Sequence, residues 1–302
     1  MTPINVCLAC DNNYAKYAGV VVASVLANSK DDESLNFYIL DGGISESKKT
    51  EILSLKSIKD CKIEFVQIEE SMFEDYKKVA THKYISIATY YRLRLATLLP
   101  EVERIIYFDC DMVVNSSLNN LFNVELGENI IAGVRDINKR MLQQNPSYIN
   151  AGMVLFDLNK IREENIEQKF YDYTNENFET IKMGDQTIIN EVLKGRIKIV
   201  EDEWNVQSSN FTNRSSYTKH PYIIHYVAKR KPWHFGSFSV HRQLYFKYLQ
   251  MTPWKLNGFK EKFYWYYLNQ VMSLINYVIY RPLFLFRPRF YEAIFKSYIV
   301  SD

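Results

Sequence analysis

The sequence predicts an α/β protein with a Rossmann-type, mainly parallel mixed sheet flanked by helices, followed by an amphipathic helical tail. Short β-branched and aromatic runs alternate with segments of helical apolar spacing, which is the pattern of βαβ units. The run 105–108 is continuously apolar, as in a strand covered on both faces. Because no repeat or low-complexity linker interrupts residues 1–250, we expect them to form one domain.

The first part of the chain reads as three strands with helices between them. The apolar run 4–9 predicts a buried strand, and the spacing of apolar residues in 17–26 predicts the helix after it. Residues 35–40 are expected to form the second strand, which ends at the turn signal Asp41-Gly-Gly43. The third strand is expected at 62–68, where polar and apolar residues alternate.

The second part contains the central strand and several further elements. A helix over 86–99, ended by Pro100, precedes that strand at 105–108. Apolar runs predict further strands at 130–134, 150–157, 197–200 and 222–225. Helices are expected from about 159 to 177, which is highly charged, and over 184–193.

Two acids follow the central strand, Asp109 and Asp111, with Cys110 between them. On an extended chain residues i and i+2 point the same way, so the carboxylates would share one small volume. Like charges that close destabilise a fold unless a cation lies between them, and hard oxygen ligands suit Mn²⁺ or Mg²⁺. Asp-x-Asp is common by chance, and 201–203 is a rival acidic run. The position after a strand favours a metal site, because open α/β sheets bind ligands there.

Composition and missing motifs exclude several classes of protein. The net charge of +2 argues against binding to nucleic acid. The chain has 10 glycines and no G-x-G-x-x-G, P-loop or G-x-S-x-G motif, so a bound nucleotide must be held by side chains and a metal. We interpret Cys7, Cys10, Cys61 and Cys110 as buried thiols, because their spacing matches no framework. The apolar strand at the N-terminus resembles no signal peptide, which predicts a cytoplasmic location.

Six motifs in series resemble glycosyltransferase family 8, and in particular its bacterial lipopolysaccharide galactosyl- and glucosyltransferases. They are Ala9-Cys-Asp-Asn-Asn-Tyr14, Ile85-Ser-Ile-Ala-Thr-Tyr-Tyr-Arg92, Asp109-Cys-Asp111, Asn150-Ala-Gly152, Asp185-Gln186 and His225-Tyr226 with Lys231-Pro-Trp-His234. The resemblance covers about residues 4–235. It implies a GT-A fold and a Mn²⁺-dependent enzyme, with Mg²⁺ as the other candidate ion. Such an enzyme transfers galactose or glucose from a UDP-sugar to a glycan or glycolipid, with retention of configuration.

The resemblance also assigns roles by motif position. It implies that Asp109, Asp111 and His225 bind the metal, that Lys231 clamps the diphosphate, and that Gln186 or Asp185 acts at the sugar. The other implied donor-binding residues are Ala9, Asp11, Asn13, Tyr14, Arg92, Cys110, Asn150, Ala151, Gly152 and Ala228. We favour front-face attack over a covalent intermediate, because an amide such as that of Gln186 is a poor nucleophile.

Each of these residues also has a purely structural interpretation. Asp11 and Asn13 could be turn formers, Asp185 a helix cap, and Arg92 a surface arginine. His225 could end a strand, Lys231 could be a solvated charge, and Asn150 and Gly152 could be loop residues. The family has a glycine beside the diphosphate where Ala228 stands, so the backbone approach there is expected to differ slightly. Its lipopolysaccharide galactosyltransferases have histidine and cysteine near the acceptor, where Tyr84 and Val227 stand. The acceptor is therefore left open.

The tail, 255–302, differs from the body in charge and pattern. It has seven Lys or Arg and three Asp or Glu, yet residues 263–280 carry no charge. Within them, Leu268, Val271, Ile275 and Ile279 share one helical face, and Asn269, Ser273, Asn276 and Tyr280 share another. Arginines interleaved with phenylalanines follow at 281–290. This pattern predicts attachment to an anionic membrane surface, on the inner face of the cell membrane, over a spanning or a soluble packing helix.

The function expected from these features is a peripheral hexosyltransferase that extends a cell-surface glycan such as lipopolysaccharide. Two alternatives remain at this point, a transferase with a protein acceptor and a catalytically silent scaffold that binds nucleotide sugars. Galactose and glucose differ at one hydroxyl, so the sequence leaves the donor sugar open.

Overall fold

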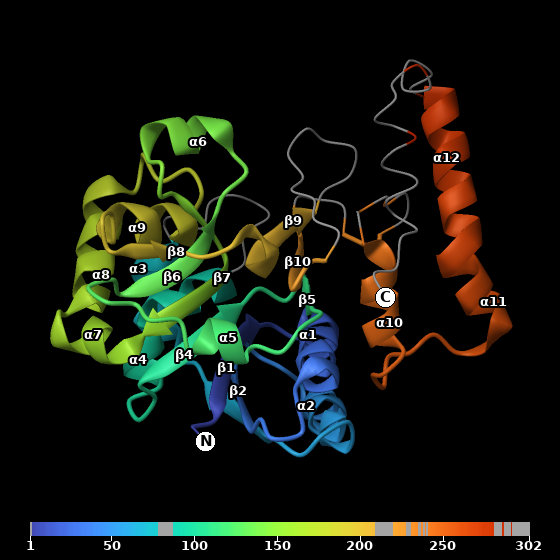
Figure 1. The fold of residues 1–302 in the computed structure, drawn as a ribbon, viewed down its shortest axis with the longest axis horizontal. Coiled ribbons are helices and arrows are strands. Elements are labelled where there is room, and N and C mark those ends of the chain that lie inside the picture. The colour runs from blue at the N-terminus through green and yellow to red at the C-terminus, as the bar shows by residue number, and fades with distance from the viewer. Residues whose placement is uncertain are drawn as a thin grey trace.

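A seven-stranded sheet forms the centre of the part of the chain described by the computed structural model, residues 2–77, 87–208, 220–227, 231–234, 237, 239, 241–280, 286 and 291 (Figure 1). The strand order is β3-β2-β1-β4-β7-β6-β8. The strands are β1 (Ile4–Cys10), β2 (Leu35–Asp41), β3 (Lys62–Gln67), β4 (Arg104–Phe108), β6 (Ile131–Arg135), β7 (Ile149–Asp157) and β8 (Ile197–Ile199). Neighbours are parallel, except that β7 is antiparallel to β4 and β6. The predicted mainly parallel mixed sheet is confirmed.

The strand order reverses between β1 and β4. The chain first adds β2 and β3 on one side of β1, and then returns to place β4 on its other side, with Val6 opposite Ile106. Ligands of open α/β sheets bind in the crevice outside the carboxyl ends of the strands at such a point. The ends of β1 and β4 therefore mark the expected site.

Helices cover both faces of the sheet. Because successive side chains alternate across a strand, Val6 and Ile106 pack in the core on the α1 side, while Cys7 and Ile105 pack against α8 and α9. The helices are α1 (Ala15–Asn28), α2 (Glu46–Leu53), α3 (Glu74–Lys77), α4 (Leu95–Leu98), α5 (Asn119–Phe122), α6 (Lys139–Gln144), α7 (Leu158–Glu163), α8 (Ile166–Asn177), α9 (Asp185–Val192) and α10 (Arg242–Leu249). Shorter 3₁₀ segments are η1 (Ser54–Ser57), η2 (Glu70–Phe73), η3 (Ile87–Arg94) and η4 (Asp202–Asn205).

A small second sheet lies beside the carboxyl end of β4. It joins β5 (Met112–Val114), β10 (Ile223–Tyr226) and β9 (Val206–Ser208), with β10 in the middle. The antiparallel pairing of β10 with β5 places His225 opposite Met112. This pairing carries His225 to the residues that directly follow β4.

Two predicted helices differ from the structure. The described part of 86–99 is 3₁₀ over Ile87–Arg94 and α-helical only over Leu95–Leu98. The consecutive Tyr90, Tyr91 and Arg92 are all buried, unlike the one-sided pattern of a surface α-helix. The long helix at 159–177 is split into α7 and α8 by Asn165, which has the positive φ of 50° that asparagine tolerates.

The cysteine prediction holds with one correction. All four are free thiols, and Cys7, Cys10 and Cys110 are buried. Cys61 is only half-buried, because it lies just before β3 at the edge of the sheet.

The tail forms a helix that stands apart from the sheet in Figure 1. It comprises α11 (Gly258–Phe263), a π-helical turn η5 (Tyr264–Leu268) and α12 (Asn269–Tyr280). The helix is fixed to the body at η5, since the buried Arg242 of α10 donates to the Trp265 carbonyl, 2.8 Å away. None of the described helices is both long enough and apolar enough to cross a bilayer.

Candidate active site

The turn after β1 is built around Asp11. Its Oδ1 accepts from the backbone N–H of Asn13 at 2.9 Å and of Tyr14 at 3.0 Å, so Asp11 shapes the start of α1, as the turn-former interpretation expects. Tyr14 remains 43% exposed. Burial raises the pKa of the Tyr14 hydroxyl, and the nearby Asp111 carboxylate raises it further by a smaller amount. This turn therefore lies beside the acid pair.

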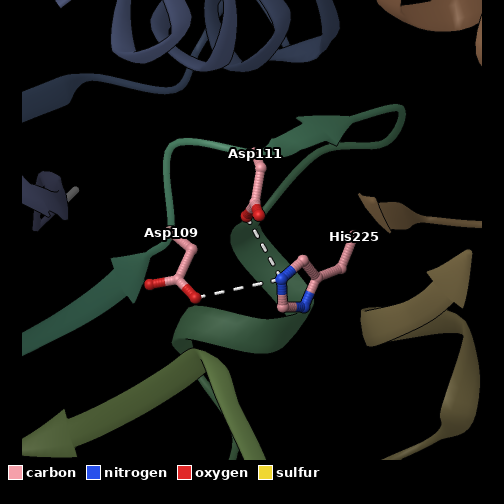
Figure 2. Close-up of side chains that lie close together, drawn as sticks. All are labelled: Asp109, Asp111 and His225. Atoms are coloured by element: carbon pink, nitrogen blue, oxygen red, sulfur yellow. Dashed lines mark ion pairs between the residues drawn. The ribbon is translucent and has the colours of Figure 1, made fainter. Parts of the chain in front are cut away.

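Asp109, Asp111 and His225 converge at the carboxyl end of β4 (Figure 2). One potential ligand atom from each lies within 4.8 Å of the others. His225 Nε2 is 3.2 Å from Asp111 Oδ1 and 3.8 Å from Asp109 Oδ2. The acids approach each other because 109–111 is a turn between β4 and β5, and not because it is extended as the sequence suggested.

The ligand chemistry of this cluster fits a divalent cation. Two carboxylates and an imidazole form a mixed oxygen and nitrogen set that suits Mn²⁺. Among the described residues, the buried Asp111 Oδ1 accepts no hydrogen bond, although His225 Nε2 lies nearby. A buried carboxylate oxygen without a hydrogen bond is costly, and a metal ligand bond would satisfy it.

His225 is held by Asn150. The imidazole Nδ1 lies 3.0 Å from Asn150 Oδ1, which also accepts from the Gly152 N–H at 3.1 Å. In a metal-bound state, Nδ1 would donate its N–H to this amide oxygen and Nε2 would direct its lone pair at the ion. Asn150 was predicted in the sugar pocket, and here it orients a candidate metal ligand.

Asp136 is a part of this network that the sequence interpretation missed. It is buried, and its Oδ2 accepts from Asn150 Nδ2 at 3.2 Å and from Gln186 Nε2 at 3.1 Å. The signal that could have found it is its position two residues after the strand predicted at 130–134, at the strand end where ligand sites gather. Asp136 fixes which way both amides point.

The side-chain amide of Gln186 is engaged in hydrogen bonds at both its oxygen and its nitrogen. Its Oε1 accepts from the Ala151 N–H at 3.1 Å and from Asn150 Nδ2 at 3.3 Å, and its Nε2 donates to Asp136. An amide oxygen that already accepts two hydrogen bonds is a weaker nucleophile than a free one.

Arg92 is a buried arginine, and the surface interpretation is wrong. Its guanidinium donates to Asp109 Oδ1 and to the Ala151 carbonyl, and it lies 4.0 Å from the Tyr107 ring centroid. Burial is possible because Asp109 and Asp185 compensate the charge. Arg92 thus connects β4, β7 and α9 beneath the acid pair.

Asp185, the first residue of α9, is buried, and the pKa of its carboxyl is raised. Burial raises the pKa of its carboxyl to about 7, against the opposing effect of Arg92. Arg92 Nε lies 3.0 Å from Asp185 Oδ2, but its N–H donates to the Thr89 carbonyl, and among the described residues none donates to that oxygen.

The raised pKa of Asp185 makes stability depend on pH. The native state binds more protons than the unfolded chain between about pH 4 and pH 7, so the free energy of unfolding falls as pH rises through this range. As the pH rises from about 5 to about 8, we expect the free energy of unfolding of Asp185→Asn to increase by about 2 kcal/mol relative to that of wild type. Urea unfolding of both proteins, with Asp202→Asn as the exposed-acid control, measures this. A difference independent of pH contradicts it.

Lys231 reaches the same acid pair from the loop after β10. Its Nζ lies 2.5 Å from Asp111 Oδ2 and 2.7 Å from the Tyr226 carbonyl. Burial would raise the pKa of Asp111, but the Lys231 ammonium and His225 hold it well below its usual range. The solvated-charge interpretation of Lys231 is wrong, since its side chain is only 14% exposed.

Most predicted residues come together at one site. Ala9 joins it through its carbonyl, which accepts from the Cys110 thiol at 3.3 Å. Ala228 and Tyr84 lie outside the described residues. The residues that share the site are Ala9, Arg92, Asp109, Cys110, Asp111, Asn150, Ala151, Gly152, Asp185, Gln186, His225 and Lys231, with Asp11, Asn13 and Tyr14 on the adjacent turn.

Comparison with known proteins identifies the family. The model of glycosyl transferase family 8 matches residues 5–236. The chain belongs to glycosyltransferase family 8. A putative glycosyltransferase of Haemophilus influenzae is 35% identical over 245 residues, which are 76% of this chain and 73% of the relative. A lipopolysaccharide 1,2-glucosyltransferase of Escherichia coli is 26% identical over 282 residues, which are 85% of this chain and 81% of that protein.

The fold agrees with this family assignment. The galactosyltransferase LgtC, solved in complex with donor and acceptor sugar analogs, matches with a TM-score of 0.71 at 24% identity, covering 86% of this chain and 99% of that one. The sheet with its reversal between β1 and β4 is therefore the GT-A fold, as the family resemblance predicted.

Proposed function

We propose that this family 8 glycosyltransferase transfers galactose or glucose, with retention of configuration, from a UDP-sugar to a cell-surface glycan such as lipopolysaccharide. The observation that carries the proposal is the convergence of Asp109, Asp111 and His225 at the end of β4, at the reversal of the strand order. A divalent ion held there, Mn²⁺ or Mg²⁺, would supply positive charge for the departing diphosphate.

Other residues of the chain would bind the donor, stabilise the diphosphate and act at the sugar. The Asp11 turn and Tyr14 stand where the nucleoside would enter, beside the acid pair. Lys231 brings a second cation to the place where charge develops on the diphosphate. Asp185 and Gln186 are the first two residues of α9, and Asp185 lies next to Arg92. These are the side chains proposed to act at the sugar. The engaged amide of Gln186 favours front-face attack over a covalent intermediate.

Release of UDP tests the proposal directly. The full chain is incubated with Mn²⁺ and either UDP-galactose or UDP-glucose, first without an acceptor, then with a lipooligosaccharide or a peptide. We expect release with one donor, strong stimulation by the oligosaccharide, and loss of activity with a chelator. Preferential stimulation by the peptide would support a protein acceptor. Binding of both donors without turnover would leave only a scaffold role.

We further propose that the tail attaches the enzyme to an anionic membrane on the cytoplasmic side. On α12, Val271, Ile275 and Ile279 lie at helical spacing and are 48%, 46% and 64% exposed. The side chains of the polar face at 269, 273, 276 and 280, and the arginines at 281, 287 and 289, lie outside the described residues. An exposed apolar helical face beside basic residues is typical of interfacial helices.

Substitution of that apolar face should reduce membrane binding. We expect Val271→Ser, Ile275→Ser and Ile279→Ser together to weaken binding to vesicles that contain anionic lipid by about tenfold or more, because the buried apolar area is lost. Cosedimentation measures this. Leu53→Ser with Met251→Ser, which alter exposed apolar residues of the body, is the control. Unchanged cosedimentation of the triple variant would reject the proposal.

A further inference from the structure

Lys231 and the proposed metal use the same carboxylate. The Lys231 ammonium contacts Asp111 Oδ2, and Asp111 Oδ1 faces the candidate metal ligand His225. Both side chains of the ion pair are largely buried, at 14% and 15% exposure. In such surroundings water screens charges poorly, so an ammonium and a divalent ion on one carboxylate repel each other strongly.

The backbone at Lys231 is held by its own contact and by those of the residues that follow it. The Pro232 carbonyl accepts from Arg242 Nε at 3.1 Å, and Trp233 stacks on Tyr17 of α1 with ring centroids 3.9 Å apart. The Lys231 N–H donates to His234 Nδ1 at 3.2 Å. Lysine has a flexible four-carbon stem, so its ammonium can change partner while this backbone stays in place.

Charge balance determines where the ammonium goes. A divalent ion on Asp109 and Asp111 satisfies those acids, while a diphosphate brings new negative charge to the same crevice. Transfer of Lys231 from Asp111 to the diphosphate leaves every anion with a cation. The opposite arrangement, an ion alone with Lys231 still on Asp111, crowds positive charge at one carboxylate.

We propose that Lys231 is an internal counter-ion that exchanges Asp111 for the diphosphate of the donor, so that metal and nucleotide bind cooperatively. The inference rests on the proposed function and adds the order of events at that site. Lys231 competes with the metal before the donor arrives, and it holds the donor afterwards. Because coupling is reciprocal, the nucleotide must raise metal affinity by the same factor by which the metal raises nucleotide affinity.

Binding of Mn²⁺ to the full chain, measured by electron paramagnetic resonance with and without UDP, tests the exchange. In the wild type we expect UDP to strengthen Mn²⁺ binding by about tenfold or more. Lys231→Met removes the competitor, so it should bind Mn²⁺ without UDP about tenfold more tightly than wild type. The same variant should lose most of the strengthening by UDP.

Two further variants show whether the effect belongs to this charge. Lys231→Arg keeps the positive charge and should keep Mn²⁺ binding weak without UDP. Lys160→Met removes a lysine from the ion pair with Asp157, away from the site, and should leave both affinities unchanged. Thermal melting of each variant confirms that it is folded.

The outcomes separate the two proposals. If Lys231→Met binds Mn²⁺ without UDP no more tightly than wild type, the exchange is wrong, although UDP and Mn²⁺ still bind together. If the wild type binds no Mn²⁺ even with UDP, the metal-dependent function fails and the exchange fails with it.

Discussion

Asp109→Asn is expected to lower kcat for UDP release by about a thousandfold or more, with little change in thermal stability. Asparagine has nearly the same shape as aspartate but carries no charge, so it is a poor ligand for a hard divalent ion. In the proposed function, charge stabilisation of the departing diphosphate is the main chemistry at the site, and a preorganised charge of this kind contributes strongly to the rate.

The fold should tolerate this substitution because Arg92 keeps other partners. Arg92 still donates to the Ala151 carbonyl and still lies beside Asp185, so its buried charge remains compensated. Thermal melting measures the fold, and UDP release over a range of Mn²⁺ concentrations measures the site. Asp202→Asn, in the exposed acidic run after β8, is the matched control and should keep full activity. Rates near those of wild type for Asp109→Asn would refute the metal assignment.

The sheet was predictable where strands are long and apolar. The runs that became β1, β2, β4 and β7 are largely buried on both faces, so apolar residues predominate in them and are visible in the sequence. The three-residue strands β5 and β9 were not predicted, whereas the equally short β8 was, from the apolar run at 197–200. β5 and β9 form only because β10 pairs with both, and that long-range contact has no local signal.

The site was predictable as a set of residue types, but not as a network. Motif order identified Asp109, Asp111 and His225, and the structure groups them. Asp136 has no motif, and its role depends on two amides that are distant in sequence and meet only in the fold. The burial of Arg92 could not be predicted either, since its compensating acids lie in the turn after β4 and on α9.

Substitution of Gly152 is expected to have the second large effect, because the His225 ring occupies the space beside it. A Cβ at this position would lie 2.3 Å from His225 Cε1 and 2.6 Å from Nδ1. The imidazole cannot yield freely, because β10 is paired on both sides and Nδ1 contacts Asn150. The Gly152 backbone is also fixed, since its carbonyl accepts from the Asp109 N–H at 2.8 Å. Gly152→Ala must therefore displace the candidate metal ligand.

We expect Gly152→Ala to weaken Mn²⁺ binding in the presence of UDP by about 10- to 100-fold and to lower turnover by at least about 100-fold, because a displaced imidazole loses both its hydrogen bond and its direction. Gly133→Ala is the matched control on the neighbouring strand β6. Its Cβ would come within 2.7 Å of Ile149 Cδ1, the end of a side chain that can adjust. That variant should lose stability by about 1–3 kcal/mol while keeping its Mn²⁺ affinity. Equal Mn²⁺ affinities for Gly152→Ala and wild type would show that His225 is not a ligand, because its ring cannot occupy the same position in both proteins.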